Sequence, residues 1–374
     1  MQFKDIIGQE EVKQRLITSV KESRVSHAQL FLGPSGSGSL ALALAYIQYI
    51  GCENRQANDS CGKCNPCNKF SKMIHPDVHF TYPVAGLRDI KNPKSIHFVA
   101  EWRAAVTENP YLNLQQWYDT LGMENKQGYI SVEESSEIIK VLSLKSFESE
   151  YKFVIIWMPE KMRTDAANKL LKIIEEPPQK TLFIMVAEDE EQIIPTIRSR
   201  TQLIKIKRLS DRELANALVE KVGIDRTKAE MAAHLSQGDY NAALTLMTEE
   251  TDTSDVNKFI DWMRLCYKLQ VKELTRWVDE MAKAGRENQK NFLYYATFMA
   301  RECLMINFAG EEITRMEENQ LVALRLFAKR INYNNGFSFV DELNKAHYHI
   351  ERNGNPKIIF MDLSIKMNSL IGAN

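Results

Sequence analysis

The feature that most constrains the fold of this chain is a glycine-rich turn between an apolar run and a helix-forming segment. Ala28–Leu32 (AQLFL) predicts a buried strand, Gly33–Gly38 (GPSGSG) predicts a tight turn, and Leu40–Ile50 predicts a helix. A strand that leads through a glycine-rich turn into a helix is typical of α/β proteins in which the helix N-terminus faces an anionic group. The order of the three segments therefore predicts an α/β domain.

Later apolar runs are expected to complete the same sheet. They are Lys152–Met158 (KFVIIWM), Thr181–Ala187 (TLFIMVA) and the short run Leu203–Ile206. Continuous apolar runs are typical of parallel strands that are covered on both faces. Apolar residues recur at helical spacing between the two long runs, which predicts a helix over Asp165–Glu176 with Thr164 as its N-cap. Residues 1–207 are therefore expected to form an α/β domain with a mostly parallel sheet.

The second half of the chain has helical patterns and lacks a strand signal. Three short helices are expected first, at 211–221, 226–235 and 240–247. Ser210 is expected to cap the first of them, and the three together make a small helical unit at 208–250. The polar stretch 249–255 (EETDTSD) predicts a linker, and 255–374 predicts long amphipathic helices.

Four of the six cysteines lie close together in the sequence. They are Cys52, Cys61, Cys64 and Cys67, with the spacing C-x8-C-x2-C-x2-C. In a reducing compartment such clustering indicates a metal, and zinc suits four thiolates in a closed tetrahedral structural site. An iron–sulfur cluster and unliganded surface cysteines are the alternatives. His75 and His79 are expected to be ordinary loop or helix-end residues, because four thiols already fill the site.

Composition narrows the class of protein. The 374 residues include 48 Lys and Arg and 49 Asp and Glu, which gives a formal net charge of −1. A surface balanced in this way is not expected to grip nucleic acid over its whole extent, although a local basic patch remains an option. The apolar stretches fall short of the roughly 20 residues that span a bilayer, and the N-terminal residues lack a signal-peptide pattern. We therefore expect a cytoplasmic protein without a membrane segment.

The glycine turn matches a nucleotide-binding loop that has lost its reactive side chains. The pattern of such loops is G-x-x-x-x-G-K-[ST], in which the lysine reaches the β- and γ-phosphates and the hydroxyl binds magnesium. Here Gly33, Gly36 and Gly38 remain, but Ser39 takes the lysine position and Leu40 takes the hydroxyl position. We expect no catalytic hydrolysis of ATP without both groups. The alternative is an unrelated glycine turn before a helix.

The apolar run at 152–158 shows a second loss of the same kind. A magnesium-binding acidic pair would be expected at its end, but Trp157 and Met158 stand there, and the first carboxylate is that of Glu160. Neither a tryptophan nor a methionine side chain can hold magnesium or activate water. Two independent losses on one scaffold indicate a former ATPase with another present role.

Four stretches together resemble the AAA+ subunits of the bacterial DNA polymerase III clamp loader. They are HAQLFLGPSGSGS at 27–39, the four-cysteine insertion, DAANKLLKIIEEPPQKTLFIMVAE at 165–188 and IIPTIRSRTQ at 193–202. The resemblance is specific over 1–83 and 129–208, weaker over 209–250, and limited to helical character beyond. Within this family the altered loop looks like that of delta-prime subunits, because gamma/tau subunits look like intact ATPases.

The resemblance implies a role for Arg200. In this family a Ser-Arg-Cys motif supplies an arginine finger to the ATP site of the neighbouring subunit, and Ser199-Arg200-Thr201 matches the motif except for Thr201. Arg200 would stabilise charge on a transferring phosphoryl group in trans, with Ser199 in support. The alternative is an arginine paired with surface carboxylates.

Three other segments bear on function. The basic residues around this motif are expected to be solvated, with DNA phosphates as the alternative partner; they are Arg198, Arg200, Lys205, Lys207 and Arg208. The pair Gly238-Asp239 is followed by Tyr240-Asn241, where the family's ATPases have a sensing arginine. The segment 84–128 is longer than the family pattern, and its aromatic residues are expected to form a local core on two short helices rather than a base-stacking platform; they are Phe98, Trp102, Tyr111, Trp117 and Tyr118.

The resemblance as a whole implies a non-hydrolysing, delta-prime-like clamp loader subunit. Its parts would be an AAA+ domain at 1–207 with a zinc module at 52–67, a helical lid at 208–250 and a helical collar at 255–374. It would hold structural Zn²⁺ but no catalytic ATP or Mg²⁺, and would act as a stator that gives Arg200 to a gamma/tau neighbour. Its partners would be gamma/tau and delta subunits and, through the assembly, the sliding clamp and primed DNA in DNA replication. The alternatives are an active gamma/tau-like ATPase with an atypical loop and a zinc-stabilised scaffold without a role in ATP chemistry.

Overall fold

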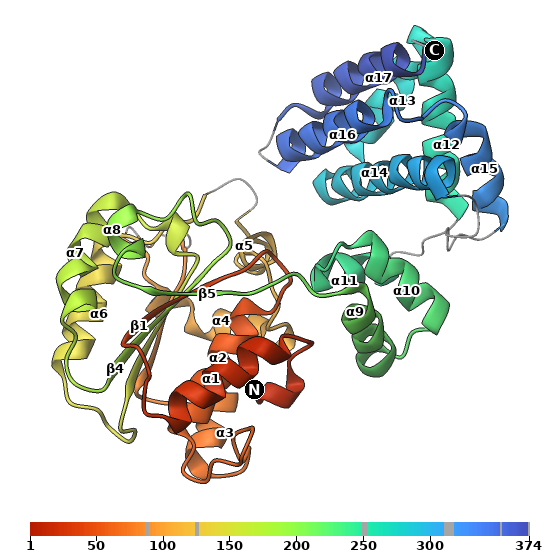
Figure 1. Ribbon diagram of the computed structural model, residues 1–374. Helices are drawn as coiled ribbons and strands as arrows, with labels where there is room; N and C mark the ends of the chain where they lie inside the picture. Colours follow the sequence, from red (N-terminus) through yellow and green to blue (C-terminus); the bar gives the residue numbers. More distant parts are fainter. Residues whose placement is uncertain are drawn as a thin grey trace. The chain divides into compact units, whose positions relative to one another are not determined.

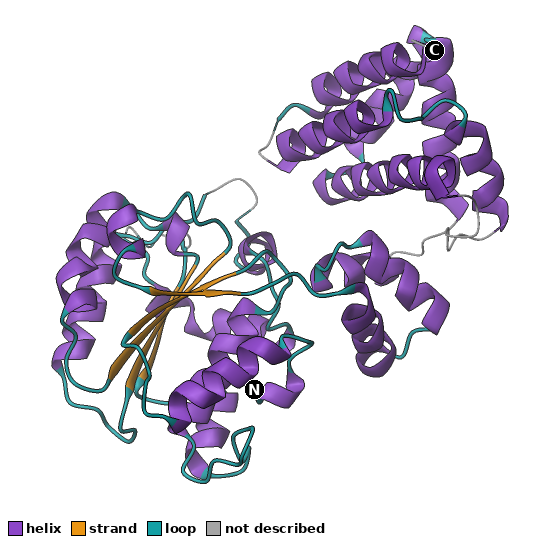
Figure 2. Cartoon of the chain, in the orientation of Figure 1, coloured by secondary structure: helices purple, strands orange, loops and turns teal. Residues whose placement is uncertain are grey.

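The computed structural model divides the chain into two compact units, Met1–Ala243 and Leu244–Asn374. It describes residues 1–86, 90, 92–123, 127–248, 253–309, 318–351 and 354–372. Figure 1 traces the chain through both units, and Figure 2 shows that the strands belong to the first unit. The division into domains at 207 and 250 remains a prediction.

A parallel five-stranded sheet forms the centre of the first unit. Its strands are β1 (Ala28–Leu32), β2 (Val78–Thr81), β3 (Lys152–Trp157), β4 (Thr181–Ala187) and β5 (Gln202–Lys205), in the order β2-β3-β4-β1-β5. Each neighbouring pair is parallel, and β1 lies between β4 and β5, with Leu30 opposite both Met185 and Leu203. The predicted parallel α/β sheet is confirmed. Every residue of β3 and β4 is buried, as their continuous apolar sequences predicted.

The edge strand β2 was not predicted. Three of its four residues are only half-buried, so its sequence, Val-His-Phe-Thr, lacks the apolar run that marks the central strands. His79 lies in this strand, which corrects its expected place in a loop or at a helix end. His75 does lie in a loop, where its ring stacks on that of Phe70 with the centroids 4.3 Å apart.

Helices cover both faces of the sheet, as Figure 1 shows for α6 and α7 on one face and α1 and α2 on the other. The helices of this part are α1 (Glu10–Lys21), α2 (Ser39–Gly51), α3 (Asn65–Ser71), α4 (Val99–Glu108), α5 (Leu114–Thr120), α6 (Val132–Ser143), α7 (Thr164–Glu175) and α8 (Pro195–Arg198). Residues Ser39–Ile50 of α2 are all buried. Alternate residues of β1 face opposite ways: Leu30 joins the core under α6 and α7, whereas the Phe31 ring lies 6.2 Å from that of Tyr46 in α2.

Two helix starts test the predicted caps. Thr164 is the first residue of α7 rather than its N-cap, because the extended residue before the helix is Arg163, whose side chain makes no capping bond. Ser210 does cap α9 (Asp211–Ala217): its hydroxyl accepts the N–H of Glu213, and the Glu213 carboxylate accepts the N–H of Ser210. The helix continues as a π-turn over Leu218–Val222, and α10 (Arg226–Leu235) and α11 (Tyr240–Thr248) follow.

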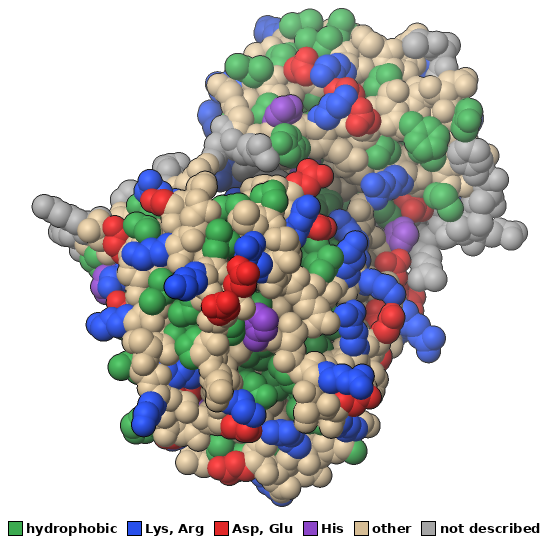
Figure 3. All heavy atoms as spheres, turned by 60° about the vertical axis from the view of Figure 1, so that its left-hand side comes forward, with side chains coloured by type: hydrophobic (Ala, Val, Ile, Leu, Met, Phe, Trp, Pro, Cys, Tyr) green, Lys and Arg blue, Asp and Glu red, His purple; other side chains and the backbone are tan. Residues whose placement is uncertain are grey.

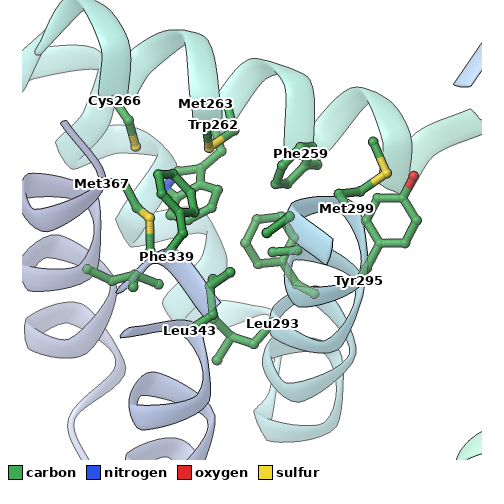
Figure 4. Packing of buried hydrophobic residues seen from close by; sticks show 14 of the residues in the cluster. Phe259, Trp262, Met263, Cys266, Leu293, Tyr295, Met299, Phe339, Leu343 and Met367 are labelled. Carbon is green, nitrogen blue, oxygen red and sulfur yellow. The ribbon is translucent and has the colours of Figure 1, made fainter. Parts of the chain in front are cut away.

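Helices make up the described part of the second unit. They are α12 (Thr253–Lys268), α13 (Val271–Lys283), α14 (Arg286–Ala309), α15 (Glu318–Ala328), α16 (Gly336–Glu351) and α17 (Pro356–Gly372). Figure 4 shows the core that they share, in which Trp262 of α12 lies among side chains from α14, α16 and α17. The Trp262 indole N–H donates to the Ser364 hydroxyl at 2.9 Å, so this buried polar group is satisfied. Of the predicted linker, residues 253–255 begin α12, and 249–252 lie outside the described residues.

Surface charge and hydropathy agree with the composition. On the face drawn in Figure 3, acidic and basic side chains are interspersed. Among the helices described, none has the length and apolarity that crossing a membrane requires.

Candidate functional site

The glycine turn joins β1 to α2 in a conformation that needs glycine at two positions. Gly36 and Gly38 have φ angles of 69° and 90°, in the left-handed region that glycine adopts without strain. The Gly33 N–H donates to the carbonyl of Ala187 at 3.1 Å, which ties the turn to the end of β4. The turn therefore keeps the backbone path that the sequence predicted.

The two positions that would carry nucleotide chemistry are buried and uncharged. Ser39 is 8% exposed, and its hydroxyl lies 3.2 Å from that of Ser37. Leu40 is 4% exposed and belongs to the apolar interior. The site thus has no lysine for a phosphate and no hydroxyl at the magnesium position.

Other parts of the chain fill the space over the turn. A Cβ atom built on Gly38 would lie 2.8 Å from Cε1 of Tyr111, and one built on Gly36 would collide with the Asp239 carboxylate. The pocket that remains has a volume of about 20 Å³, is partly open to solvent, and is lined by the turn, residues 110–112 and the ends of β3 and β4. These contacts were not predicted, because no spacing rule relates Tyr111 or Asp239 to the glycine turn.

The end of β3 is closed in the same way. Trp157 and Met158 are each 2% exposed, and the Trp157 ring lies 5.2 Å from that of Trp102 in α4. Burial raises the pKa of the Glu160 carboxyl, and its Oε1 accepts the N–H of Glu188 at 2.9 Å. Glu160 thus holds the backbone after β4, while Glu188 lines the small cavity and adds a negative group where a phosphate would need a positive one.

Of the aromatic residues of 84–128, Trp102 and Trp117 lie in a local core as predicted, whereas Tyr111 lies over the glycine turn. The ring of Trp102 stacks on that of Tyr82 at 4.2 Å and meets that of Trp117 edge-on at 5.2 Å. Both tryptophans are at most 1% exposed, which leaves no open face for a base. The predicted pair of short helices is α4 and α5. Residues 87–89, 91 and 124–126 of this segment lie outside the described residues.

Arg200 lies in the turn between α8 and β5, and its side chain is 33% exposed. Its Nε donates to Oε2 of Glu175, the last residue of α7, at 2.7 Å, and its Nη1 donates to the carbonyl of Thr196 at 3.1 Å. The Ser199 hydroxyl donates to the same carbonyl at 3.2 Å. The other terminal nitrogen, Nη2, has no hydrogen-bond partner among the described residues. The pairing with a surface carboxylate, which was the alternative to the finger, is therefore present, and one edge of the guanidinium remains open.

Thr201, which stands where the family has cysteine, supports this turn. Its hydroxyl lies 3.3 Å from the carbonyl of Ile197 and 3.2 Å from that of Arg198. The hydroxyl thus closes the turn behind Arg200, which explains why threonine fits here.

The other basic residues near Arg200 mostly have partners within the chain. Arg198 lies 3.5 Å from Glu190, Lys207 lies 3.0 Å from Glu11, and Arg208 donates to the carbonyl of Gln237 at 2.9 Å. These pairings favour a solvated surface over a dedicated DNA-binding patch.

The side chains of the four clustered cysteines converge in the structure. Their sulfur atoms all lie within 4.8 Å of one another, with Cys52 and Cys64 4.0 Å apart and Cys61 and Cys67 3.9 Å apart. Tetrahedral zinc with Zn–S bonds of about 2.3 Å would place the sulfurs about 3.8 Å apart, so the group has the size of a zinc site. Backbone N–H groups, first that of Lys63, lower the pKa of Cys61 to about 6, whereas burial raises the pKa of Cys52 and of Cys67.

The family model that describes the DNA polymerase III delta subunit matches residues 8–210. The match contains the sheet, the glycine turn, the cysteine cluster and Arg200. It covers more than half of the chain, and the chain therefore belongs to this family of DNA polymerase III clamp loader subunits.

Individual relatives carry related names. The chain is 22% identical to the DNA polymerase III subunit tau of Bacillus subtilis over 98% of its own length and 61% of that protein. It is 27% identical to the delta' subunit of Bacillus subtilis over 57% of its length and 52% of that protein. It is 23% identical to the delta' subunit of Escherichia coli over 83% of its length and 79% of that protein. The chain thus spans only half to three fifths of the first two relatives.

Among solved structures, the chain is similar to a DNA polymerase III gamma subunit-related protein from Thermotoga maritima. The identity is 15%, the TM-score is 0.37, and 96% of this chain and 99% of that chain are covered.

Proposed function

We propose that this chain is a non-hydrolysing, delta-prime-like subunit of a clamp loader. The observation that carries the proposal is the glycine turn, where the lysine and hydroxyl positions hold Ser39 and Leu40 and the remaining cavity is about 20 Å³. A nucleoside triphosphate needs both charge and space there. The subunit would hold no catalytic ATP or Mg²⁺ of its own.

Arg200 would act on the ATP site of a gamma/tau neighbour. Its ion pair with Glu175 is exposed, and such pairs contribute about 0–1 kcal/mol, so the pair does not prevent the guanidinium from meeting a phosphate. The open Nη2 edge gives a planar, permanently charged donor for the transferring γ-phosphoryl group. Arginine fingers given in trans are worth about 10³–10⁵ in rate. Ser199 would support this role by fastening the turn to Thr196.

The rest of the chain would serve assembly. The four cysteines would hold a structural zinc, residues 208–250 would form a helical lid on an AAA+ domain at 1–207, and residues 255–374 would form the collar that joins gamma/tau and delta subunits. Through that cytoplasmic assembly the subunit would help to place the sliding clamp on primed DNA.

A gamma/tau-like ATPase with an atypical loop is the second candidate. The observation in its favour is the alignment with a tau subunit over 98% of this chain. The side chains at Ser39, Leu40, Trp157 and Met158 weigh against it, because none of them can replace the lysine or hold magnesium.

The test of the finger is Arg200→Ala in a loader reconstituted with gamma/tau and delta subunits. Lys205→Ala is the matched control, since it removes a positive charge from the exposed edge of the neighbouring strand. We expect Arg200→Ala to lower DNA-stimulated ATP hydrolysis and clamp loading sharply, while size-exclusion chromatography shows an intact assembly. Clamp loading at the control level would disprove the role of Arg200.

A further inference from the structure

We propose that residues 109–112 are a built-in occupant of the phosphate-loop site and that they clasp the start of α11 to the glycine turn. These contacts would hold the first residues of α11 against the α/β domain without any ligand. The inference concerns contacts within Met1–Ala243, and it stands whether or not Arg200 acts on a neighbour.

Hydrogen bonds to other parts of the chain hold residues 109–112 in place. The 84–128 segment that carries it is closed at its base by two backbone hydrogen bonds between Val84 and Tyr129, at 3.2 and 3.1 Å. The Tyr111 hydroxyl accepts the N–H of Ile7 at 2.8 Å, and its ring lies against Gly38. Tyr111 is 5% exposed and the adjacent Leu112 is 6% exposed. A group of this size and burial takes the place that a phosphate would need over the turn.

The clasp is made by Asn241 in the first turn of α11, which is 3% exposed. Its amide nitrogen donates to the carbonyl of Tyr111, and its amide oxygen accepts from Nδ2 of Asn109 at 2.6 Å. The ring of Tyr240 packs against that of Tyr111 with the centroids 4.9 Å apart. One asparagine side chain therefore satisfies two groups of the occupant, about 130 residues away in the sequence.

The glycine turn also contacts the residues at the start of α11. The N–H of Tyr240 donates to the carbonyl of Gly36 at 3.3 Å, and the Asp239 carboxylate lies against Gly36, where a Cβ atom would not fit. Three separate segments thus meet in one buried network. Because buried polar networks depend on complete pairing, opening this one would expose unsatisfied groups on all three segments.

Amide hydrogen exchange in the full-length chain tests the clasp. The variant Asn241→Ala removes both side-chain bonds, and Asn216→Ala is the matched control, because it removes a half-buried asparagine of α9 that accepts from Arg226 at 2.6 Å. We expect exchange of the amides in 36–40 and 109–112, and of the Tyr240 amide, to accelerate together by about 10- to 100-fold in Asn241→Ala. The amides of β1 and β4 should keep their rates, and the control should leave all of these segments unchanged.

The inference is overturned if 36–40 keeps its wild-type exchange rates in Asn241→Ala, or if every segment accelerates equally. Should Asn241→Ala fail to fold, Asn109→Ala removes the donor to Asn241 and the acceptor of the Tyr111 N–H, and it leaves the bond from Asn241 to the Tyr111 carbonyl. That variant should accelerate the same three segments by about 3- to 10-fold. Unchanged rates there would also overturn the inference.

Discussion

The glycine turn after β1 and the Arg200 turn before β5 adjoin two neighbouring, hydrogen-bonded strands, yet the glycine turn is packed against other segments and the Arg200 turn is partly exposed. At the glycine turn, Ser39 and Leu40 are at most 8% exposed, and Tyr111 lies against Gly38. At the other turn, the Arg200 side chain is one-third exposed, and one guanidinium nitrogen has no hydrogen-bond partner among the described residues. Under the proposed function, packing would take the place of nucleotide chemistry within the chain, whereas the exposed Arg200 would act on another chain.

Under the proposed function, the difference would follow from how buried and exposed sites respond when a ligand is no longer bound. A buried cavity that no longer holds a ligand leaves its lining without contacts, so side chains that fill it are stabilising. An exposed arginine makes little difference to stability either way. The same scaffold can therefore lose one function by filling its site and retain another at its surface.

The largest effect on stability is expected from a substitution in the glycine turn. In Gly38→Ala a methyl group would lie 2.8 Å from the Tyr111 ring in a residue with φ of 90°. Overpacking and left-handed strain should together lower the free energy of unfolding by about 3 kcal/mol, measured by urea denaturation.

The control for this variant is Gly223→Ala. Gly223 has φ of 78°, but a Cβ atom there would meet nothing within 4 Å. It should lose only about 1 kcal/mol through backbone strain. Equal losses of unfolding free energy in the two variants would show that close contact with Tyr111 adds nothing to the cost of Gly38→Ala.

A smaller effect, on ATP turnover, is expected from removing the carboxylate that holds Arg200. Glu175→Ala removes the carboxylate that holds Nε of Arg200, so the guanidinium should sample more orientations. ATP turnover by the reconstituted loader should fall by about two- to fivefold, corresponding to at most ~1 kcal/mol.

Glu175→Gln, which can still accept from Nε, should recover most of the turnover. Glu176→Ala, one residue later and also exposed, should behave as wild type. If Glu175→Ala raised turnover instead, the ion pair would be a restraint on Arg200 and not a support for it.

The sequence predicted the parts of the fold that have a local signal. Both β1 and β4 were predicted to the residue, because each is a short apolar run between clear boundaries. The edge strand β2 was missed because half-buried edge strands need no apolar run. The cysteine cluster was predicted from its spacing, since ligands close in the sequence converge within a few turns.

The contacts that define the candidate site were beyond such reasoning. The altered residues Ser39 and Leu40 predicted that nucleotide chemistry is missing, but not that Tyr111 fills the space. Tyr111 and Asn241 reach the glycine turn from distant segments, and Glu175 reaches Arg200 from another helix. Tertiary pairs of this kind depend on how elements pack, and a single sequence does not encode them in its spacing.

The most direct test of the central claim is equilibrium binding of ATP to the isolated wild-type chain, with and without Mg²⁺, together with steady-state hydrolysis with and without primed DNA. The account predicts no saturable binding up to about millimolar ATP, the weak end of the usual range for enzyme substrates, and no turnover. Saturable, magnesium-dependent binding with turnover that survives removal of contaminating ATPases would contradict it. That result would mean that the glycine turn can open and that the chain is an ATPase in its own right.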